Sequence, residues 1–271
     1  MIKDMLELRK KIKTEQPLIH CITNPISIHA CANVVLALGA RPIMAEHPAE
    51  VAQITATAGA LMLNLGNITD VRMKSMEISL RTAKENEIPV LLDLVGTACS
   101  DLRFHYAKHL MEIGGIAVLK GNMSELLAMA GCPSHSIGVD AGEKDAVTNQ
   151  NQKEMAAILG QLAKETGSVI LASGKKDMVV SESSAYVLSN GDPMLSCITG
   201  TGCMQGAACA TYLACEDPLL AGLLAAATMG IAGELAAEKC HGPGSFQAEF
   251  LDQLYGMSDL ELQNRIQMEQ I

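Results

Sequence analysis

The sequence has very few aromatic residues and an excess of negative over positive charge. Of its 271 residues 3% are aromatic, none is tryptophan, and 20 Lys and Arg stand against 30 Asp and Glu, a net charge of −10. Single-stranded nucleic acids are bound on aromatic stacking platforms, and every nucleic acid needs basic groups to neutralise its phosphates. We therefore expect no nucleic-acid partner.

The sequence also lacks the marks of a secreted or membrane-embedded protein. Its first residues, Met1 to Asp4, lead into a charged amphipathic segment and not into a signal peptide. Apolar runs such as 219–227 are shorter than the ~20 residues that a spanning helix needs. The nine cysteines are an odd count without the spacing of a disulfide framework, which favours reduced thiols. We expect a cytoplasmic protein that spans no membrane.

What is present is a regular alternation of apolar runs with helix-like segments. Hydrophobic residues make up 49% of the chain, and no repeat or linker divides it, so we predict one domain over 1–271. Several apolar runs are unbroken, which is typical of a mostly parallel sheet covered by helices on both faces, a three-layer α/β/α fold. The predicted strands are 17–22, 41–45, 60–64, 89–93, 116–120 and 169–172, followed by a hairpin at 176–188.

Residues at the ends of the predicted strands are the first candidates for a functional site, because ligands of such folds bind beyond the carboxyl ends of the strands. Asp93 ends one strand, and Glu125 lies one turn into a later helix. Both are candidate Mg²⁺ ligands, direct or through water, because Mg²⁺ needs only one or two carboxylates besides phosphate oxygens. The alternative is that Glu125 complements its helix N-terminus and Asp93 caps a turn. The strand-exit residues are Asn24, Met44, Asn64, Asp93, Lys120 and Ser173.

Two further patterns concern phosphate and metal binding. Lys120 either reaches a phosphate as a point charge or is an ordinary solvated lysine at a strand end. His105 and His109 lie four residues apart, but the Glu of a zinc-protease motif is missing, which favours a solvated helix face. No Gly-x-x-x-x-Gly-Lys-Ser/Thr segment occurs, so the chain is not a P-loop protein.

The chain is organised around the turn Gly200, Thr201, Gly202 and Cys203, which precedes a predicted helix from 204 to 213. Glycines let a ligand approach the backbone closely, and the helix that follows presents unpaired N–H groups and a positive dipole end. Such a turn binds anions, most often phosphate. The alternative is a purely structural turn. Cys203 lies at the open side of this turn. It is either a base or nucleophile with a lowered pKa, or a small packed cysteine.

With these residues in view, the sequence resembles the hydroxyethylthiazole kinase family of the ribokinase-like superfamily. The resemblance covers nearly the whole chain, and the segments in this order are specific to the family. They are Pro17–Asn24, Ala32–Ala45, Ala60–Gly66, Leu92–Gly96, Lys120–Glu125, Gly138–Gly142, Thr199–Cys203 and Gly242–Phe246.

The resemblance implies a ribokinase-like fold and ATP-dependent phosphorylation of 4-methyl-5-(2-hydroxyethyl)thiazole in thiamine salvage. It implies that the turn carries the catalysis and that a homotrimer has its sites at subunit interfaces. Related enzymes have Asp as the base where this chain has Cys203. The implied roles are catalysis for Gly200, Thr201, Gly202 and Cys203, substrate binding for Asn24, Met44 and Gly200, ATP binding for Lys120 and Ser173, and Mg²⁺ binding for Asp93 and Glu125.

The sequence departs from the family pattern at a few positions. Lys120 stands where Arg is usual, so a bidentate grip on phosphate becomes a point contact. Leu94 replaces a usual Pro, and Ser173 replaces Thr. Two other functions therefore stay open at this point: a kinase for another alcohol, such as hydroxymethylpyrimidine, and a sensor that binds the thiazole or a nucleotide without turnover.

Overall fold

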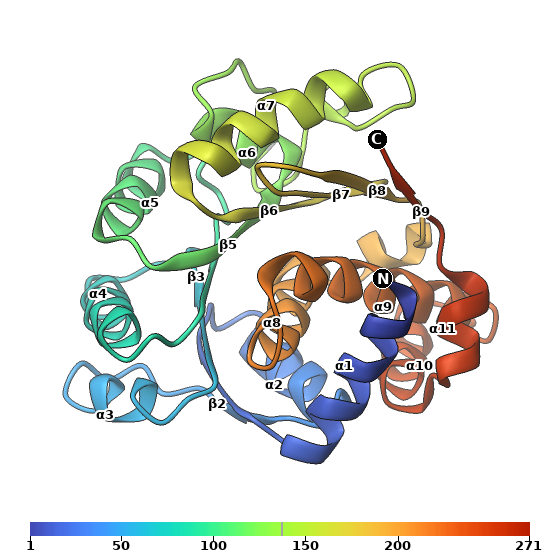
Figure 1. Ribbon diagram of the computed structural model, residues 1–271, viewed down its shortest axis with the longest axis horizontal. Coiled ribbons are helices and arrows are strands. Elements are labelled where there is room, and N and C mark those ends of the chain that lie inside the picture. Colours follow the sequence, from blue (N-terminus) through green and yellow to red (C-terminus); the bar gives the residue numbers. More distant parts are fainter. Residues whose placement is uncertain (137) are drawn as a thin grey trace.

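The computed structural model describes residues 1–136 and 138–271, whose strands form one sheet (Figure 1). The strand order is β2-β1-β3-β4-β5-β6-β7-β8-β9; the pairs from β2 to β6 are parallel, and those from β6 to β9 are antiparallel. The mostly parallel sheet and the hairpin are confirmed. The strands are β1 Leu18–Ile22, β2 Arg41–Ile43, β3 Ala60–Asn64, β4 Val90–Asp93, β5 Ile116–Asn122, β6 Val169–Ser173, β7 Asp177–Val180, β8 Ala185–Leu188 and β9 Met268–Gln270.

Helices cover both faces of the sheet, which confirms the three layers. One face is covered by α1, α2 and α8 to α11, the other by α3 to α7 (Figure 1). The helices are α1 Ile2–Glu15, α2 Ile28–Ala37, α3 Val51–Thr55, α4 Asp70–Glu85, α5 Asp101–Ile113, α6 Met123–Met129, α7 Gln152–Thr166, α8 Thr201–Leu213, α9 Pro218–Ala237, α10 Pro243–Gly256 and α11 Asp259–Arg265, with short 3₁₀ turns η1 Glu143–Asp145 and η2 Pro193–Cys197.

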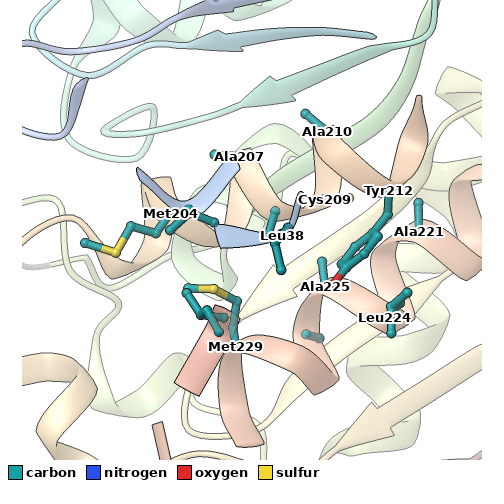
Figure 2. Packing of buried hydrophobic residues seen from close by; sticks show 14 of the residues in the cluster. Leu38, Met204, Ala207, Cys209, Ala210, Tyr212, Ala221, Leu224, Ala225 and Met229 are labelled. Atoms are coloured by element: carbon teal, nitrogen blue, oxygen red, sulfur yellow. The ribbon is translucent and has the colours of Figure 1, made fainter. Parts of the chain in front are cut away.

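Small side chains bring α8 and α9 close to the sheet and to each other (Figure 2). A Cβ atom on Gly206 of α8 would lie 2.8 Å from Met62 Cε of β3, and one on Gly222 of α9 would lie 3.0 Å from Val179 of β7. Tyr212, one of the few aromatic residues, is buried where the two helices meet. Because close-packed contacts resist displacement, the start of α8 is held at a fixed height above the strand ends.

Helix α9 contains the apolar run 219–227. It has 20 residues with a mean hydropathy of 1.7, so its length and composition alone would allow it to cross a membrane, contrary to our expectation for this segment. However, 89% of its apolar 18-residue stretch is buried inside the protein, against the sheet and against α8 and α10. A buried helix of this kind is hydrophobic all round because it has no solvent-facing side.

The sequence prediction missed the last two elements, α11 and β9. Ser258 and Glu261 form a capping box at the start of α11, a signal that the sequence did contain. Strand β9 has three residues and pairs with β8 at the edge of the sheet, and its polar composition gives no strand pattern.

Candidate active site

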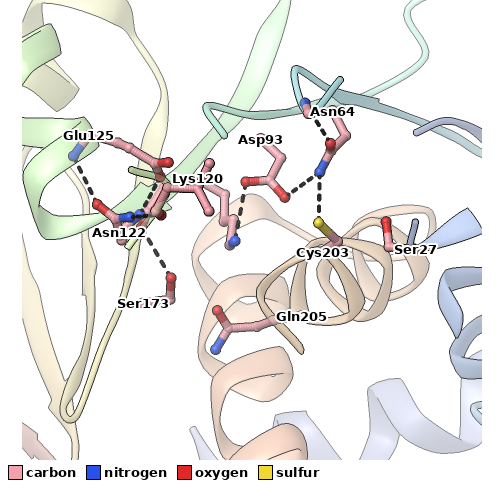
Figure 3. Close-up of polar contacts among 12 residues, drawn as sticks. Ser27, Asn64, Asp93, Lys120, Asn122, Glu125, Ser173, Cys203 and Gln205 are labelled. Atoms are coloured by element: carbon pink, nitrogen blue, oxygen red, sulfur yellow. Dashed lines mark hydrogen bonds and ion pairs between the residues drawn. The ribbon is translucent and has the colours of Figure 1, made fainter. Parts of the chain in front are cut away.

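Three neighbouring parallel strands end in polar residues that stand in register. Asn64 pairs with Asp93, and Asp93 pairs with Lys120, so these side chains form a row across β3, β4 and β5. Because residues in register on adjacent strands point to the same face, all three side chains face α8 (Figure 3). All three are buried. The sequence placed Asn64 at a strand exit but gave it no role.

The glycine turn lies directly above this row. Gly200 has φ +85°, a left-handed conformation, and a Cβ atom there would lie 3.1 Å from Ser27 Cβ. The first backbone hydrogen bond of α8 runs from Met204 N to Gly200 O, so the amides of Thr201, Gly202 and Cys203 precede it and have no helical partner. This arrangement has the geometry expected of an anion-binding turn.

Lys120 lies beneath the turn and not in solvent. Its side chain is 4% exposed, its Nζ is 3.1 Å from Asp93 Oδ1, and a Cβ atom on Gly202 would lie 3.2 Å from that Nζ. Burial disfavours the ammonium charge, but Asp93, with help from Cys203 and Glu125, outweighs it and raises the pKa of Lys120. A fixed positive charge therefore stands at the glycine turn, and the solvated-lysine interpretation is wrong.

Cys203 is held by two side-chain amides. Its Sγ accepts N–H groups from Asn24 Nδ2 at 3.4 Å and from Asn64 Nδ2 at 3.3 Å. Burial, followed by the charge of Asp93, raises the pKa of the Cys203 thiol, although Lys120 opposes this. The expected lowering of the pKa at a helix N-terminus is therefore wrong here, because desolvation outweighs the helix dipole. The resting side chain is a protonated thiol.

Asn64 connects the thiol to the charged pair. Its Nδ2 also donates to Asp93 Oδ2 at 2.8 Å, and its Oδ1 accepts from Asn24 Nδ2 at 3.1 Å and from Gly66 N at 2.9 Å. Burial raises the pKa of Asp93, and Lys120 and Asn64 partly offset this rise. The result is one continuous network from Asn24 to Lys120. Figure 3 shows its part from Cys203 through Asn64 and Asp93 to Lys120.

Glu125 is built into the start of α6. Its oxygens accept from Asn122 N at 2.7 Å and Gly96 N at 2.7 Å, and Asn122 completes a capping box. Burial raises the pKa of Glu125 to about 7. The interpretation that Glu125 complements its helix N-terminus is thus correct. Because both carboxylate oxygens already accept hydrogen bonds, a metal ion could reach Glu125 only through its remaining lone pairs or through water.

The described residues contain no group of three or more His, Cys, Asp or Glu side chains arranged to hold a metal ion by themselves. Asp93 and Glu125 nevertheless bring two buried carboxylates to one ammonium group, that of Lys120. This excess of negative charge is compatible with a Mg²⁺ ion that phosphate oxygens and water bind, with the two carboxylates in its outer sphere.

The two remaining predicted site residues lie on opposite sides of the network. Ser173, at the end of β6, stands opposite Asn122 and donates from Oγ to Gly121 O at 3.3 Å. Met44 follows β2, the other edge of the parallel region, and is half-buried against the α8-side core. The predicted nucleotide and substrate residues are thus separated along the sheet, with Cys203 and Lys120 between them.

A mostly parallel sheet with a glycine turn and helix N-terminus above its strand ends defines a ribokinase-like fold. A ribokinase-like superfamily protein from Enterococcus faecalis V583 superimposes with a TM-score of 0.58 over 93% of each chain at 13% identity, which shows the fold alone. The model of the hydroxyethylthiazole kinase family matches residues 9–259. The chain belongs to this family.

Individual relatives agree with this assignment. A hydroxyethylthiazole kinase 2 from Clostridium botulinum (strain Hall) is 49% identical over 254 residues, which cover 94% of this chain and 96% of the relative. A hydroxyethylthiazole kinase from Methanobrevibacter smithii is 37% identical over 99% and 97% of the two chains. The solved structure of a hydroxyethylthiazole kinase from Pyrococcus horikoshii OT3 has a TM-score of 0.90 at 29% identity, covering 99% of each chain.

Proposed function

We propose that this kinase transfers the terminal phosphoryl group of ATP to the hydroxyl group of 4-methyl-5-(2-hydroxyethyl)thiazole. The observation that carries the proposal is the placement of the free amides of Thr201, Gly202 and Cys203 directly above the Lys120 ammonium, in a chain of this family. Phosphoryl transfer depends mainly on positioning and on stabilising the charge of the transferred group. The turn and Lys120 supply that charge stabilisation.

The two substrates approach the turn from opposite sides. Asn24 and Met44, together with Gly200, line the thiazole site on the side of β1 and β2. Ser173 and Lys120 contact ATP on the side of β5 and β6. The separation of these residues along the sheet supports the assignment, because it leaves the turn between the donor and the acceptor.

Cys203 steers the acceptor hydroxyl and does not act as a strong base. Its sulfur already accepts two amide N–H groups, and its raised pKa keeps the thiol protonated. In a loose transition state the hydroxyl group of the acceptor does not need to lose its proton before the phosphoryl group arrives. The thiol therefore fixes the direction from which the hydroxyl oxygen attacks.

Mg²⁺ is the cofactor that fits this site. Asp93 and Glu125 would hold it through water, and when bound it would neutralise charge on the phosphates of ATP. Both carboxylates already accept hydrogen bonds from the protein, so their contribution is orientation and charge.

We further propose a cytoplasmic homotrimer of single-domain chains with sites at the subunit interfaces. Ile26, two residues after Asn24, exposes 61% of its surface, and Leu36 on α2 exposes 54%. A neighbouring subunit would cover both side chains. All nine cysteines are free thiols, as a reducing compartment requires. Light scattering on the wild type and on Leu36→Asp tests the assembly: a fully active monomer would contradict interface sites.

The activity itself is tested by phosphate transfer from Mg·ATP to hydroxyethylthiazole, with hydroxymethylpyrimidine and ribose as parallel acceptors. We expect product from the thiazole alone. Product from another acceptor in preference would indicate a different alcohol kinase, and thiazole binding without any product would indicate a sensor.

A further inference from the structure

A second buried polar contact starts from α8, on the side of the helix that faces β7. Gln205 lies two residues beyond Cys203, and its Nε2 donates to Asp177 Oδ2 at 2.6 Å. Asp177 is the first residue of β7, and its Oδ1 accepts the backbone N–H of Gly174 at 2.9 Å. Gln205 and Asp177 are 6% and 8% exposed. One carboxylate thus joins the helix of the anion-binding turn to the turn between β6 and β7.

That second turn, residues 173–176, carries groups suited to a nucleotide. It begins with Ser173 and adds Lys175 and Lys176, while the N–H group of Gly174 is already donated to Asp177. Lys176 Nζ also binds Asn149 Oδ1 at 2.5 Å, so the far end of the turn is anchored as well. Its position relative to α8 depends on Asp177 and Gln205.

The oxygen of the Gln205 side chain has no hydrogen-bond partner among the described residues, although it is fully buried. Figure 3 shows this oxygen on the side toward Lys120. Folded proteins seldom leave a buried polar atom unsatisfied, so such an atom calls for an explanation. Packing alone would be served as well by an apolar side chain. The N–H group donated to Asp177 is the contact that requires an amide here.

We propose that Gln205 is a positioning residue for the nucleotide: through Asp177 it fixes the turn 173–176 relative to the N-terminus of α8. The proposal rests on the proposed function, because it takes the turn 173–176 as the ATP side of the site. Gln205 acts through Asp177 and Gly174 and leaves the thiazole side, around Asn24 and Met44, unchanged. Its loss therefore weakens nucleotide binding selectively.

The first test uses Gln205→Leu, which keeps the volume and removes the N–H donor. The dissociation constant of a non-hydrolysable Mg·ATP analogue is measured by calorimetry, and that of hydroxyethylthiazole in parallel. Because a hydrogen bond to a charged group is lost, we expect nucleotide affinity to fall by about tenfold or more while thiazole affinity stays within about twofold. The matched control is Gln161→Leu, which removes an exposed glutamine–carboxylate bond on α7 and should change neither affinity.

The second test uses Gln205→Glu and keeps the proposal falsifiable if the leucine variant does not fold. Two facing carboxyl groups repel each other unless they share a proton, and lowering the pH supplies that proton. The measured quantity is the nucleotide affinity of this variant divided by that of the wild type. We expect this ratio to rise as the pH is lowered from 8 to about 5.5. Lys120 of β5 is the charged group that acts on Asp177. The titratable groups of α8 are Cys203, Cys209 and Tyr212, and β8 places the apolar Leu188 opposite Asp177. The division by wild type removes the titration of ATP, which is common to both proteins. Burial raises the pKa of Asp177 to about 6 in the wild type.

The outcomes separate this inference from the proposed function. Equal weakening of both ligands by Gln205→Leu, or unchanged nucleotide affinity, would overturn it, as would a flat pH ratio for Gln205→Glu. A wild type that binds the nucleotide but does not phosphorylate the thiazole would overturn the proposed reaction. The role of Gln205 would then be decided by the nucleotide and thiazole affinities of the variants alone. A wild type that binds no nucleotide would overturn both.

Discussion

The ammonium group of Lys120 lies 3.1 Å from the carboxylate of Asp93, and both are almost completely buried beneath the first turn of α8. A buried ion pair contributes little net stability, because desolvation of both charges opposes their attraction. Its value here is positional. Asp93 holds a positive charge at the place where the amides of the glycine turn also converge. In the proposed reaction an incoming phosphoryl group would therefore meet a prearranged electrostatic environment.

Removing one member of this pair should cost more than removing both. Lys120→Met leaves an uncompensated buried carboxylate, and we expect a loss of about 3–5 kcal/mol in unfolding free energy together with loss of activity. The double variant Lys120→Met/Asp93→Asn should recover most of the stability and none of the activity. Urea unfolding and the kinase assay measure both. If the double variant proves as unstable as the single one, the pair is not the source of the effect.

Gly202→Val should abolish most of the activity without unfolding the protein. Its side chain would begin 3.2 Å from Lys120 Nζ and fill the space where the phosphoryl group binds, so we expect kcat/KM to fall by about 100-fold or more. Gly244→Val is a matched control, because Gly244 is also the second residue of a helix but has open space around it. Normal turnover by the Gly202 variant would refute the anion site.

Cys203→Ala should weaken turnover without abolishing it, because the thiol steers the hydroxyl and the charge stabilisation remains. Cys203→Asp should retain activity, since the amides of Asn24 and Asn64 that now donate to sulfur can donate to a carboxylate. Cys209→Ala, at a buried cysteine further along α8, controls for packing. A folded but inert aspartate variant would rule out the steering role.

His20 predicts a pH dependence of stability. Its ring nitrogens bond to Thr55 Oγ1 and Ala45 O at 2.9 Å each, and burial lowers the pKa of His20 below its ordinary value of 6.5. The unfolded chain therefore binds a proton more readily than the native one, so the contribution of neutral His20 is present above about pH 6.5 and is lost as the pH falls through its lower folded value. Urea midpoints between about pH 7 and pH 5 should show this slope in the wild type.

In the variant His20→Gln the slope should be weaker, because the group that titrates is gone. His105→Gln, at an exposed histidine, should keep the wild-type slope. Since Ala45 follows Met44, His20→Gln should also raise the KM for the thiazole more than that for ATP. An unchanged slope would assign the acid sensitivity to other groups.

The sequence predicted the architecture well because the β strands of a parallel sheet are unbroken apolar runs, as in Ala60–Asn64 and Val90–Asp93. It also singled out the glycine turn, Lys120 and the two carboxylates. The sequence could not predict that these residues are buried. The burial of Lys120 and the raised pKa of Cys203 both follow from how closely α8 approaches the sheet, a tertiary property set by small residues such as Gly206.

The role of Asn64 was missed for a related reason. A strand-end asparagine is ordinary by itself, and its significance arises from register: it stands beside Asp93 on the neighbouring strand and beneath Cys203 on a helix more than a hundred residues later. Likewise, Gln205 and Asp177 carry no local motif. Their contact exists only because the fold brings the first turns of α8 to the start of β7.

The buried helix α9 has a consequence for the synthesis of this protein. In composition it is a hydrophobic segment that, exposed in isolation, would be prone to aggregate or to associate with a membrane. However, it is encoded late, after the strands of the parallel sheet and after α8. A nascent chain emerging from the ribosome therefore already contains most of the surface that covers α9, so this order of translation shortens the interval during which the helix is exposed.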